Sequence, residues 1–337
     1  NLGLDLQLFR SVSMNFEYYG RRSNAIIEQD VAEEYGMGTL RLNGGIIVNH
    51  GVEWSMNITP VKTKDWTVNL GFNASKNWNK TETDDRTARA DQLTHKDFIS
   101  GNSSRPLRKG YSLYSFWAYD FTGLEHETGL PTFRGTSLEA PEDGGDKSID
   151  PTTFLVYAGE SEPYFTGGFN PRVRWKDLQL SASFALILGS TKRLPNPYSS
   201  FSNGKMPSPL SNISKQLLDR WKQPGDEAHT NIPGLYTSVL DELNLYTPDG
   251  LFTNRYDMWA QSTARLVSGS FLRCTQLSLS YNLPKSVCRL IRATGISLSA
   301  NTNNIFVIAS KKWNGYDPET GSSKQPKIYS FGLSVSF

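Results

Sequence analysis

The feature that most constrains the fold of this chain is a long alternation of apolar and polar residues, which recurs along its 337 residues. In the segment 66–75, apolar side chains occupy every second position, namely Trp66, Val68, Leu70, Phe72 and Ala74. Successive side chains of a β-strand point to opposite faces. Each such segment therefore predicts a strand with one apolar and one polar side, and the chain as a whole predicts an all-β fold.

Two classes of all-β protein have strands that alternate in this way: soluble sandwiches and the β-barrels of outer membranes. The alternating segments run to roughly 10–17 residues, whereas strands of globular sheets usually have about 5–6. Their polar faces carry Ser, Asn, Gln and Gly more often than Lys and Glu, although a solvated face is usually charged. Aromatic residues recur near the expected strand ends, at Trp54, Trp66, Trp78, Trp175 and Tyr281. All three features favour a membrane barrel with aromatic girdles.

The composition excludes several other classes of protein. A net charge of +2 gives no strong field for nucleic acid. The two cysteines, Cys274 and Cys288, form neither a disulfide framework nor a C-x-x-C pair. No run approaches the roughly 18 apolar residues of a transmembrane helix. The mean hydropathy of −0.46 does not argue against a membrane barrel, because alternating strands average to a mild value.

The alternating segments predict nine membrane-spanning strands, at 2–9, 12–28, 41–58, 65–80, 166–175, 178–189, 268–283, 295–306 and 328–337. The long connections between them are 29–40, 81–164, 190–262 and 307–327. In outer-membrane barrels the periplasmic turns are short and the extracellular loops are long, so we expect these four segments outside the cell. The stretch YSLYSFWAYDFT at 111–122 also resembles a strand, but the parity of the crossings places it within the second long loop.

Nine strands cannot by themselves make a complete barrel of the usual kind. Single-chain bacterial barrels have an even number of strands, and an open sheet would leave the N–H and C=O groups of its edges unpaired in lipid. The chain begins inside an alternating segment, with neither an initiator Met nor a signal peptide. We therefore expect residues 1–337 to be the C-terminal portion of a larger barrel, with further strands N-terminal to them.

Two short helices are expected in the connections. Five apolar residues follow Pro209 at helical spacing and predict a helix near 210–221, namely Leu210, Ile213, Leu217, Leu218 and Trp221. The segment from Pro284 to Ala293 predicts a turn of helix on the periplasmic side.

Five stretches, in order along nearly the whole chain, resemble the SusC-like (RagA-like) TonB-dependent outer-membrane transporters of Bacteroidetes. They are LNGGIIVNHGVEW at 42–54, DRWKQPGDEAHTNIP at 219–233, SFLRCTQLSLSYNLP at 270–284, WNGYDPETG at 313–321 and the final FGLSVSF. One departure is Cys274, which stands where the family more often has an aliphatic residue.

This resemblance implies a 22-stranded barrel with a plugged lumen. It also implies a SusD-like surface lipoprotein as a lid, energy from the TonB complex, and a dimer of transporter–lid pairs surrounded by outer-membrane lipids. The plug and the segment that contacts TonB would precede residue 1. The cargo would be an oligomeric nutrient, either a glycan or an oligopeptide. The alternatives are another outer-membrane barrel, such as a siderophore receptor or a porin, and a secreted β-rich carbohydrate-binding protein.

Candidate substrate-path residues lie in the aromatic stretch of the second loop. Sugars stack on flat aromatic faces, and Tyr114, Trp117 and Tyr119 could line a path above the lumen. The alternative, which the sequence favours, is that these rings pack the loop against the plug or the capping partner. The motifs RWKQPGD and Asp317-Pro318-Glu319 are interpreted in the same way, as a loop-folding element and a turn.

No catalytic site, cofactor or resident metal is expected. The four histidines, His50, His95, His126 and His229, are scattered without paired spacing. A loop calcium site near Asp143, Asp146 and Asp150 is a weaker alternative to a solvated acidic loop, since the spacing is not that of an EF-hand.

The last segment predicts a closing strand with a lipid-facing side. Ser330, Gly332, Ser334 and Ser336 would face the lumen, and the alternate residues would face lipid, namely Tyr329, Phe331, Leu333, Val335 and Phe337. The family resemblance implies that this aromatic ending is the signal that the barrel-assembly machinery recognises.

Overall fold

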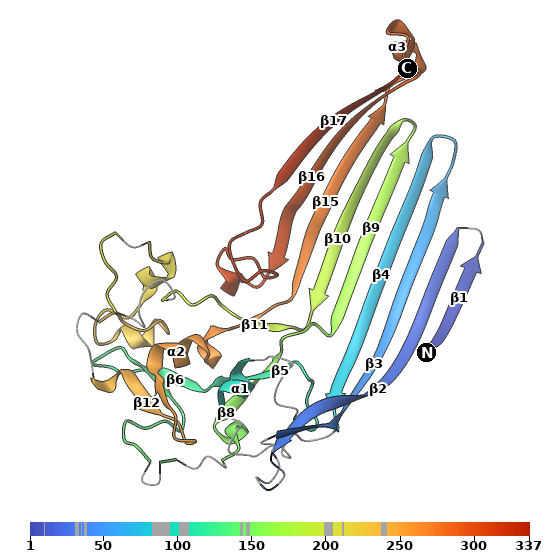
Figure 1. The fold of residues 1–337 in the computed structure, drawn as a ribbon. Helices are drawn as coiled ribbons and strands as arrows, with labels where there is room; N and C mark the ends of the chain where they lie inside the picture. Colours follow the sequence, from blue (N-terminus) through green and yellow to red (C-terminus); the bar gives the residue numbers. More distant parts are fainter. Residues whose placement is uncertain are drawn as a thin grey trace.

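One antiparallel sheet of nine strands carries the chain (Figure 1). In this computed structural model the strands lie in the order β1-β2-β3-β4-β9-β10-β15-β16-β17. The structure describes residues 1–9, 11–30, 34, 36, 39–82, 95–100, 108–141, 144–145, 149–198, 205–210, 212–236 and 241–337. Among these residues, no helix has both the length and the apolar character needed to cross a membrane.

The nine predicted strands are confirmed. They are β1 (Leu2–Leu8), β2 (Val12–Asp30), β3 (Thr39–Lys62), β4 (Trp66–Thr81), β9 (Phe165–Trp175), β10 (Leu178–Leu188), β15 (Phe271–Asn282), β16 (Gly295–Ala309) and β17 (Ile328–Ser336). Most boundaries agree with the prediction to within one or two residues, β16 ends three residues later than predicted, and two further differences have a local cause. β3 continues past 58 to Lys62, through an irregularity between Ile58 and Val61. The predicted strand 268–283 is divided, because the chain leaves the sheet at Gly269, whose N–H donates to the Ser190 carbonyl at 2.8 Å.

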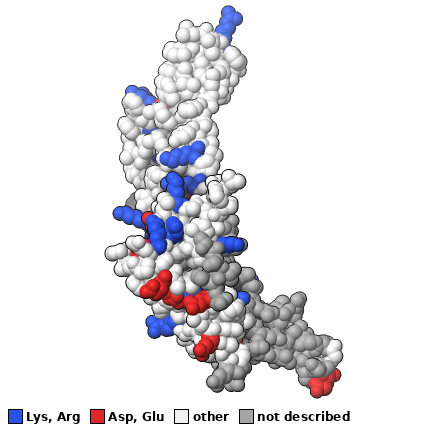
Figure 2. Space-filling model, turned by 90° about the vertical axis from the view of Figure 1, so that its left-hand side faces the viewer, with Lys and Arg blue, Asp and Glu red and all other residues white. Residues whose placement is uncertain are grey.

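The connections confirm the predicted parity. In Figure 1 the short turns lie at one end of the sheet, together with α3 (Lys285–Leu290), and the long excursions gather at the other end. α3 lies within the helical turn predicted for 284–293. Seen from the side, charged side chains concentrate toward the loop end, and the opposite part of the surface is mostly uncharged (Figure 2).

The apolar side of the sheet carries aromatic rings at two levels and at its loop end. Nearest the short turns, Trp66 and Trp175 stack with ring centroids 5.9 Å apart. Further along the strands, Phe72 and Phe169 stack at 4.8 Å. Trp78 lies twelve residues beyond Trp66 on β4, which is roughly 40 Å along a strand and about 30 Å across a membrane for a strand tilted by about 40°. This span matches the hydrocarbon thickness of a bilayer, about 30 Å.

A β-bulge interrupts the alternation of β15. Gln276 pairs with Ser183 of β10 and Cys274 pairs with Phe184, so the residue between them has no partner in the neighbouring strand. That residue is Thr275, whose hydroxyl donates to the Ser183 carbonyl at 3.1 Å. One extra residue exchanges the two sides of the sheet for everything that precedes it in the strand. Cys274 therefore joins the apolar side.

The excursions fold into a second body of small elements at the loop end of the sheet, which we call the loop body. Their helices and strands are α1 (His95–Ser100), β5 (Ser115–Tyr119), β6 (Phe121–Leu124), β7 (Pro131–Phe133), β8 (Leu155–Glu160), β11 (Thr191–Arg193), β12 (Asn244–Tyr246), β13 (Phe252–Asn254), α2 (Arg255–Ala260) and β14 (Leu266–Ser268). The strands pair as β5-β8, β6-β7, β11-β14 and β12-β13, apart from the main sheet. The prediction that 111–122 contains a strand outside the membrane sheet is confirmed by β5.

The core of this body is rich in aromatic residues. It is formed by Phe98, Ile99, Trp117, Tyr119, Leu130, Phe133, Phe154, Leu155, Tyr198, Leu217, Leu243, Leu245, Tyr256, Met258 and Trp259. α2 contributes its buried face because the Asn254 side chain caps it, accepting from the Tyr256 N–H at 2.9 Å. The loops therefore have a hydrophobic core of their own.

The helix predicted near 210–221 is largely absent. A single 3-10 turn, η5 (Lys215–Asp219), stands in its place, with Ser214 as N-cap. Leu217 is buried, whereas Leu210 is 98% exposed and Leu218 is 65% exposed. The prediction of a helix was wrong because, of these five apolar residues, only Leu217 packs into the hydrophobic core.

Candidate functional site on the polar face and in the loops

The polar side of the sheet is rich in side-chain amides. Around Gly71 of β4 it has a hollow of about 340 Å³, lined by Ser55, Asn57, Asn69, Asn73, Asn170 and Arg172. The Thr59 hydroxyl donates to Asn69 at 2.9 Å, and Asn79 donates to Asn49 at 2.6 Å. An amide both donates and accepts hydrogen bonds. This face can therefore bind polar solutes such as glycan hydroxyls or peptide groups, as well as the surface of a hydrated plug.

The three candidate substrate-path residues lie in the loop body. Trp117 and Tyr119 are buried, at 5% and 2% exposure, and Tyr114 is half-buried. Both rings are buried within the core of the loop body itself, and packing against a plug or a lid stays a prediction. Their role in a substrate path stays a prediction.

Trp117 forms a cluster of three aromatic rings with Tyr111 and Tyr157. Its ring centroid lies 5.2 Å from that of Tyr111 and 5.4 Å from that of Tyr157, and the two tyrosine rings are 5.1 Å apart. Tyr157 is 40% exposed, and burial of its other side raises the pKa of its phenol to about 12. Tyr157 is the most exposed member of this cluster. Sequence reasoning missed it because β8 is short and its partner strand, β5, lies far from it in the sequence.

A buried histidine connects α1 to the loop that precedes β13. His95 is fully buried, and its Nδ1 lies 2.7 Å from Asp249 Oδ2. The Thr247 hydroxyl donates to the other Asp249 oxygen at 2.5 Å. Burial by itself raises the pKa of Asp249, but the hydrogen bonds from His95 and Thr247 outweigh it, and the pKa lies below its ordinary value. The pair joins two excursions that are far apart in sequence.

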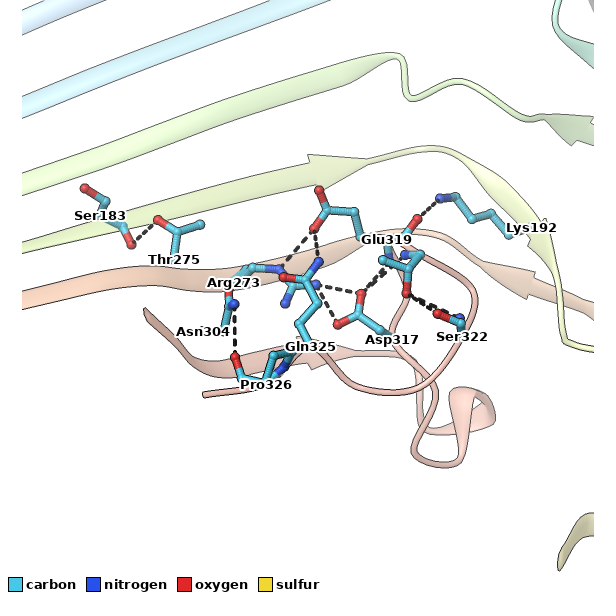
Figure 3. Close-up of polar contacts among 11 residues, drawn as sticks. Ser183, Lys192, Arg273, Thr275, Asn304, Asp317, Glu319, Ser322, Gln325 and Pro326 are labelled. Atoms are coloured by element: carbon cyan, nitrogen blue, oxygen red, sulfur yellow. Dashed lines mark hydrogen bonds and ion pairs between the residues drawn. The ribbon is translucent and has the colours of Figure 1, made fainter. Parts of the chain in front are cut away.

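The motif WNGYDPETG is attached to the polar side of the sheet by a buried ion pair (Figure 3). Arg273 of β15 donates from one guanidinium nitrogen to both Asp317 oxygens, at 2.7 and 2.8 Å. Both side chains are almost fully buried, and Glu319 lies 3.3 Å from the Arg273 Nε. Asp317 also accepts from the Glu319 N–H at 3.0 Å, as a turn-starting acceptor does.

The bulge at Thr275 makes this ion pair possible. If the alternation continued regularly from Leu277, Arg273 would point to the apolar side of the sheet. The extra residue instead pairs Arg273 with Ala185 on the polar side, where Asp317 lies. Asn304, opposite the bulge, adopts a positive φ of 55° and donates to the Pro326 carbonyl at 3.3 Å. Irregular residues on two strands thus bind the same loop.

The motif RWKQPGD folds as a hydrogen-bonded turn. Asp226 accepts from the N–H groups of Lys222 and Gln223, at 3.0 and 3.2 Å. Glu227 accepts from the Trp221 indole at 3.3 Å and lies 2.6 Å from His126 Nδ1. The hydrogen bond with Glu227 raises the pKa of His126, and the same bond lowers the pKa of Glu227 to about 2.

Trp221 also explains two glycines of the loop body. A Cβ on Gly129 would lie 2.3 Å from the Trp221 ring, and one on Gly234 would lie 2.9 Å from it. Gly129 in addition has a φ of +66°. Close approach to the ring therefore requires glycine at both positions.

The candidate calcium residues are only partly visible. Asp143 and Asp146 lie outside the described residues. Asp150 pairs with Arg108 at 2.7 Å and caps η3 (Pro151–Thr153) through the Thr152 N–H. Hydrogen bonds from Arg108 and Thr152 overcome the effect of burial and hold the pKa of Asp150 at about 2. Within the described part of the chain, no group of three or more His, Cys, Asp or Glu is placed to hold a metal.

The candidate assembly signal lies on the outermost strand of the sheet. β17 pairs with β16 through all nine of its residues and has no further neighbour among the described strands. Phe331 and Phe337 are 85% and 83% exposed, and Tyr329, Leu333 and Val335 lie on the same apolar side. Their role in assembly stays a prediction.

No protein-family model matches the chain. It is 24% identical over 332 residues to the TonB-dependent receptor P3 of Formosa agariphila, a match that covers 95% of this chain and 30% of the relative. It is 27% identical over 314 residues to the TonB-dependent receptor SusC of Bacteroides thetaiotaomicron, covering 88% of this chain and 27% of SusC. Among solved structures, a chain of the RagAB peptide transporter matches with a TM-score of 0.67 and 24% identity, over 99% of this chain and 34% of that one.

These comparisons confirm the resemblance to SusC-like and RagA-like transporters that the five motifs indicated. They place the chain in the outer membrane, as part of a β-barrel. The relatives are receptors and transporters, in agreement with the prediction that the chain is not an enzyme. The chain spans about a third of the length of the curated relatives it matches, at 30%, 32% and 27%.

Proposed function

We propose that the protein to which this SusC-like, RagA-like chain belongs imports oligomeric nutrients across the outer membrane, with energy from the TonB complex. The observation that carries the proposal is similarity to TonB-dependent receptors over 88–96% of the chain. The polar, amide-rich side of the sheet supports it, because oligomers that pass through a barrel need hydrogen-bonding partners along the way.

Two partners belong to the proposal. A SusD-like lipoprotein would close the extracellular mouth as a lid, and the TonB complex would act through a segment that precedes residue 1. The loop body supports a lid, because it has a hydrophobic core of its own. A lid protein that closes the barrel needs an ordered loop surface to bind. The same resemblance supports a dimer of transporter–lid pairs.

The cargo is a glycan or an oligopeptide. RagAB is described as a peptide transporter, which favours a peptide for this chain. The polar hollow around Gly71 suits either, because amides bind sugar hydroxyls and peptide groups alike.

Uptake by intact cells tests the proposal. We would delete the full-length gene, restore it, and follow fluorescent oligopeptides and fluorescent oligosaccharides in parallel. The proposal expects uptake of one class to be lost on deletion and restored by the gene, and also to be abolished by a protonophore, because TonB transmits energy from the inner membrane. Uptake that persists with the protonophore would indicate a porin. Affinity purification in detergent should recover a lipoprotein with the transporter, and its absence would exclude the lid.

A further inference from the structure

The apolar side of the sheet has a hollow between its aromatic rings. It has a volume of about 440 Å³ and is lined almost entirely by apolar atoms. Its floor is formed by the two small residues Ala74 of β4 and Gly167 of β9, which pair with each other. Its walls include Trp54, Phe165, Phe169 and Leu186. A pocket of this size lies within the range of small-molecule sites.

The hollow lies in the loop-side half of the apolar band. Ala74 is four residues from Trp78 along β4, which is roughly 13 Å, and eight residues from Trp66. Its position is therefore that of lipid acyl chains beneath the headgroups. No side chain of the described residues fills the space above Ala74 and Gly167. Only a molecule that lies against the outside of the sheet could cover them.

A lysine stands at the headgroup end of the hollow. Lys76 pairs directly with Phe165 and points to the same side of β4 as Ala74, two residues further toward the loops. Its ammonium lies 4.8 Å from the ring centroid of Trp78 and 5.4 Å from that of Tyr164. Among the described residues, no carboxylate forms an ion pair with it. Such a lysine extends its charge toward the membrane surface.

From this arrangement we propose that the outer surface of the barrel binds one anionic membrane lipid. An acyl chain lies in the hollow, over Ala74 and Gly167, and the lipid phosphate accepts from the ammonium of Lys76. The two exposed rings, Trp78 and Tyr164, hold that ammonium at the depth of the headgroups. The site is independent of the transported cargo, because it is on the opposite side of the sheet from the amide-rich face.

An anionic lipid fits this site better than a neutral one or a protein. The ammonium has two aromatic partners and three donors, so a phosphate oxygen completes its surroundings. A protein partner would need an apolar segment that crosses the bilayer beside the barrel, whereas lipid is already there. A zwitterionic lipid such as phosphatidylcholine would fill the hollow and offer a phosphate, but its own choline cation would compete with the lysine for that phosphate.

Native mass spectrometry of the full-length protein tests the site. The protein would be released from detergent micelles after incubation with phosphatidylglycerol or with phosphatidylcholine of identical chains. We expect one retained phosphatidylglycerol, at least about fivefold more abundant than retained phosphatidylcholine. Lys76→Gln should lower phosphatidylglycerol retention to the phosphatidylcholine level. Lys80→Gln is the matched control, because Lys80 is an exposed lysine on the same side of the same strand and should leave retention unchanged.

A second variant tests the hollow itself. Gly167→Leu would fill it, and its Cβ would lie 3.2 Å from the edge of the Phe165 ring, a side-chain contact rather than a backbone one. We expect loss of both lipids, with heat-modifiable migration on gels showing that the barrel has folded. If that variant does not fold, Ala74→Leu fills the same space from the neighbouring strand. Equal retention of the two lipids, equal effects of the two lysine variants, or full retention by the filled variant would overturn the proposal. The proposal would also be overturned if the protein were a dimer that Gly167→Leu dissociates and Lys76→Gln does not, because a second protein would then occupy the hollow.

Discussion

At the scale of single residues, the pair Arg273–Asp317 attaches the loop of the DPE motif to the sheet. Both side chains are almost fully buried. Removing one partner from such a pair typically costs about 3–5 kcal/mol, because a buried charge is left uncompensated. The pKa of Asp317 lies below its ordinary value, since donation from Arg273 outweighs the effect of burial. The loop should therefore be sensitive to changes at this one carboxylate.

We predict that Asp317→Asn opens the loop 310–327. A cost of at least about 3 kcal/mol raises the population of the open form by roughly a hundredfold. Trypsin cleavage at Lys312 or Lys324 should accelerate accordingly. Glu319→Gln is the control, because Glu319 is half-exposed and contacts the same arginine, so its loss should cost at most about 1 kcal/mol. Equal cleavage rates for Asp317→Asn and the unchanged protein would contradict the prediction.

A second prediction concerns pH and the pair His126–Glu227. The pKa of His126 is raised by its hydrogen bond to Glu227, so its contribution to stability is complete below the unfolded pKa of about 6.5 and is lost as pH rises through the folded pKa. The pKa of Glu227 is lowered to about 2, so its contribution is present above an unfolded pKa of about 4.3 and is lost as pH falls toward about 2. The pair should therefore stabilise the turn most between about pH 4.3 and about pH 6.5.

Glu227→Gln separates the two groups. Without the carboxylate, the pKa of His126 should fall toward about 6.5. An imidazole NMR titration measures it directly, and with four histidines in the chain the signal can be assigned by His126→Asn. Glu127→Gln is the control, since Glu127 lies 3.9 Å from the same ring and is a smaller cause of the shift. An unchanged pKa in Glu227→Gln would show that the pair does not form in solution.

At the scale of elements, the bulge of β15 decides which side chains meet the membrane. Alternation alone would place Leu272 on the polar side, together with Gln276. The extra residue Thr275 puts Leu272 on the apolar side instead, paired with Leu186 of β10 and lining the apolar hollow. A short local irregularity thus reverses the orientation of the start of the strand.

Leu272→Arg tests this reversal. Leu272 is level with Gly167, between the bilayer midplane and the headgroups. A lipid-facing arginine costs about 2–4 kcal/mol at the midplane and less toward the interfaces, so we expect a partial loss of folded, heat-modifiable protein on insertion into lipid vesicles. Gln276→Arg should be tolerated, because its side chain is exposed on the polar side. If Leu272→Arg were tolerated as well as Gln276→Arg, the strand would be regular and the bulge absent.

The elements that sequence patterns predicted poorly are those whose form depends on distant partners. The helix expected near 210–221 became a single 3-10 turn, because the core of the loop body accepts Leu217 and leaves Leu210 in solvent. Apolar spacing shows which residues share a face, but not whether another part of the chain covers that face. The strands were predicted well because in a membrane sheet the covering phase is the lipid itself.

At the scale of the whole molecule, the nine-stranded sheet has two free edges in the described structure, on β1 and β17. Unpaired backbone groups are costly in lipid. The relatives are about three times as long as this chain, so we expect further strands of the full-length protein to pair with these edges and close the barrel.

Phe337→Asp tests the role of the last strand in assembly. The side chain is 83% exposed on the apolar side of the edge strand, where a charge would face lipid. We expect several-fold less protein in isolated outer membranes, with the inserted fraction still functional. Ser336→Asp carries the same charge on the polar side and is the matched control. Unchanged outer-membrane levels of Phe337→Asp would refute a role for this aromatic residue as an assembly signal.

Sequence patterns were enough to predict the strand number, the two faces of the sheet, the ends at which the turns and loops lie, and the family resemblance. These features follow from period-two alternation and from short motifs, which are local properties of the chain. Each face of a membrane sheet meets one kind of surroundings, lipid or the polar lumen, so alternation alone assigns the residues to faces. Only the tertiary structure decided the partners of Arg273, the burial of Trp117 and the lining of the apolar hollow. Each of these joins residues from separate strands or loops, 44 positions apart for Arg273 and Asp317. Such contacts depend on register and on one bulged residue, which the chain does not reveal until its strands are paired.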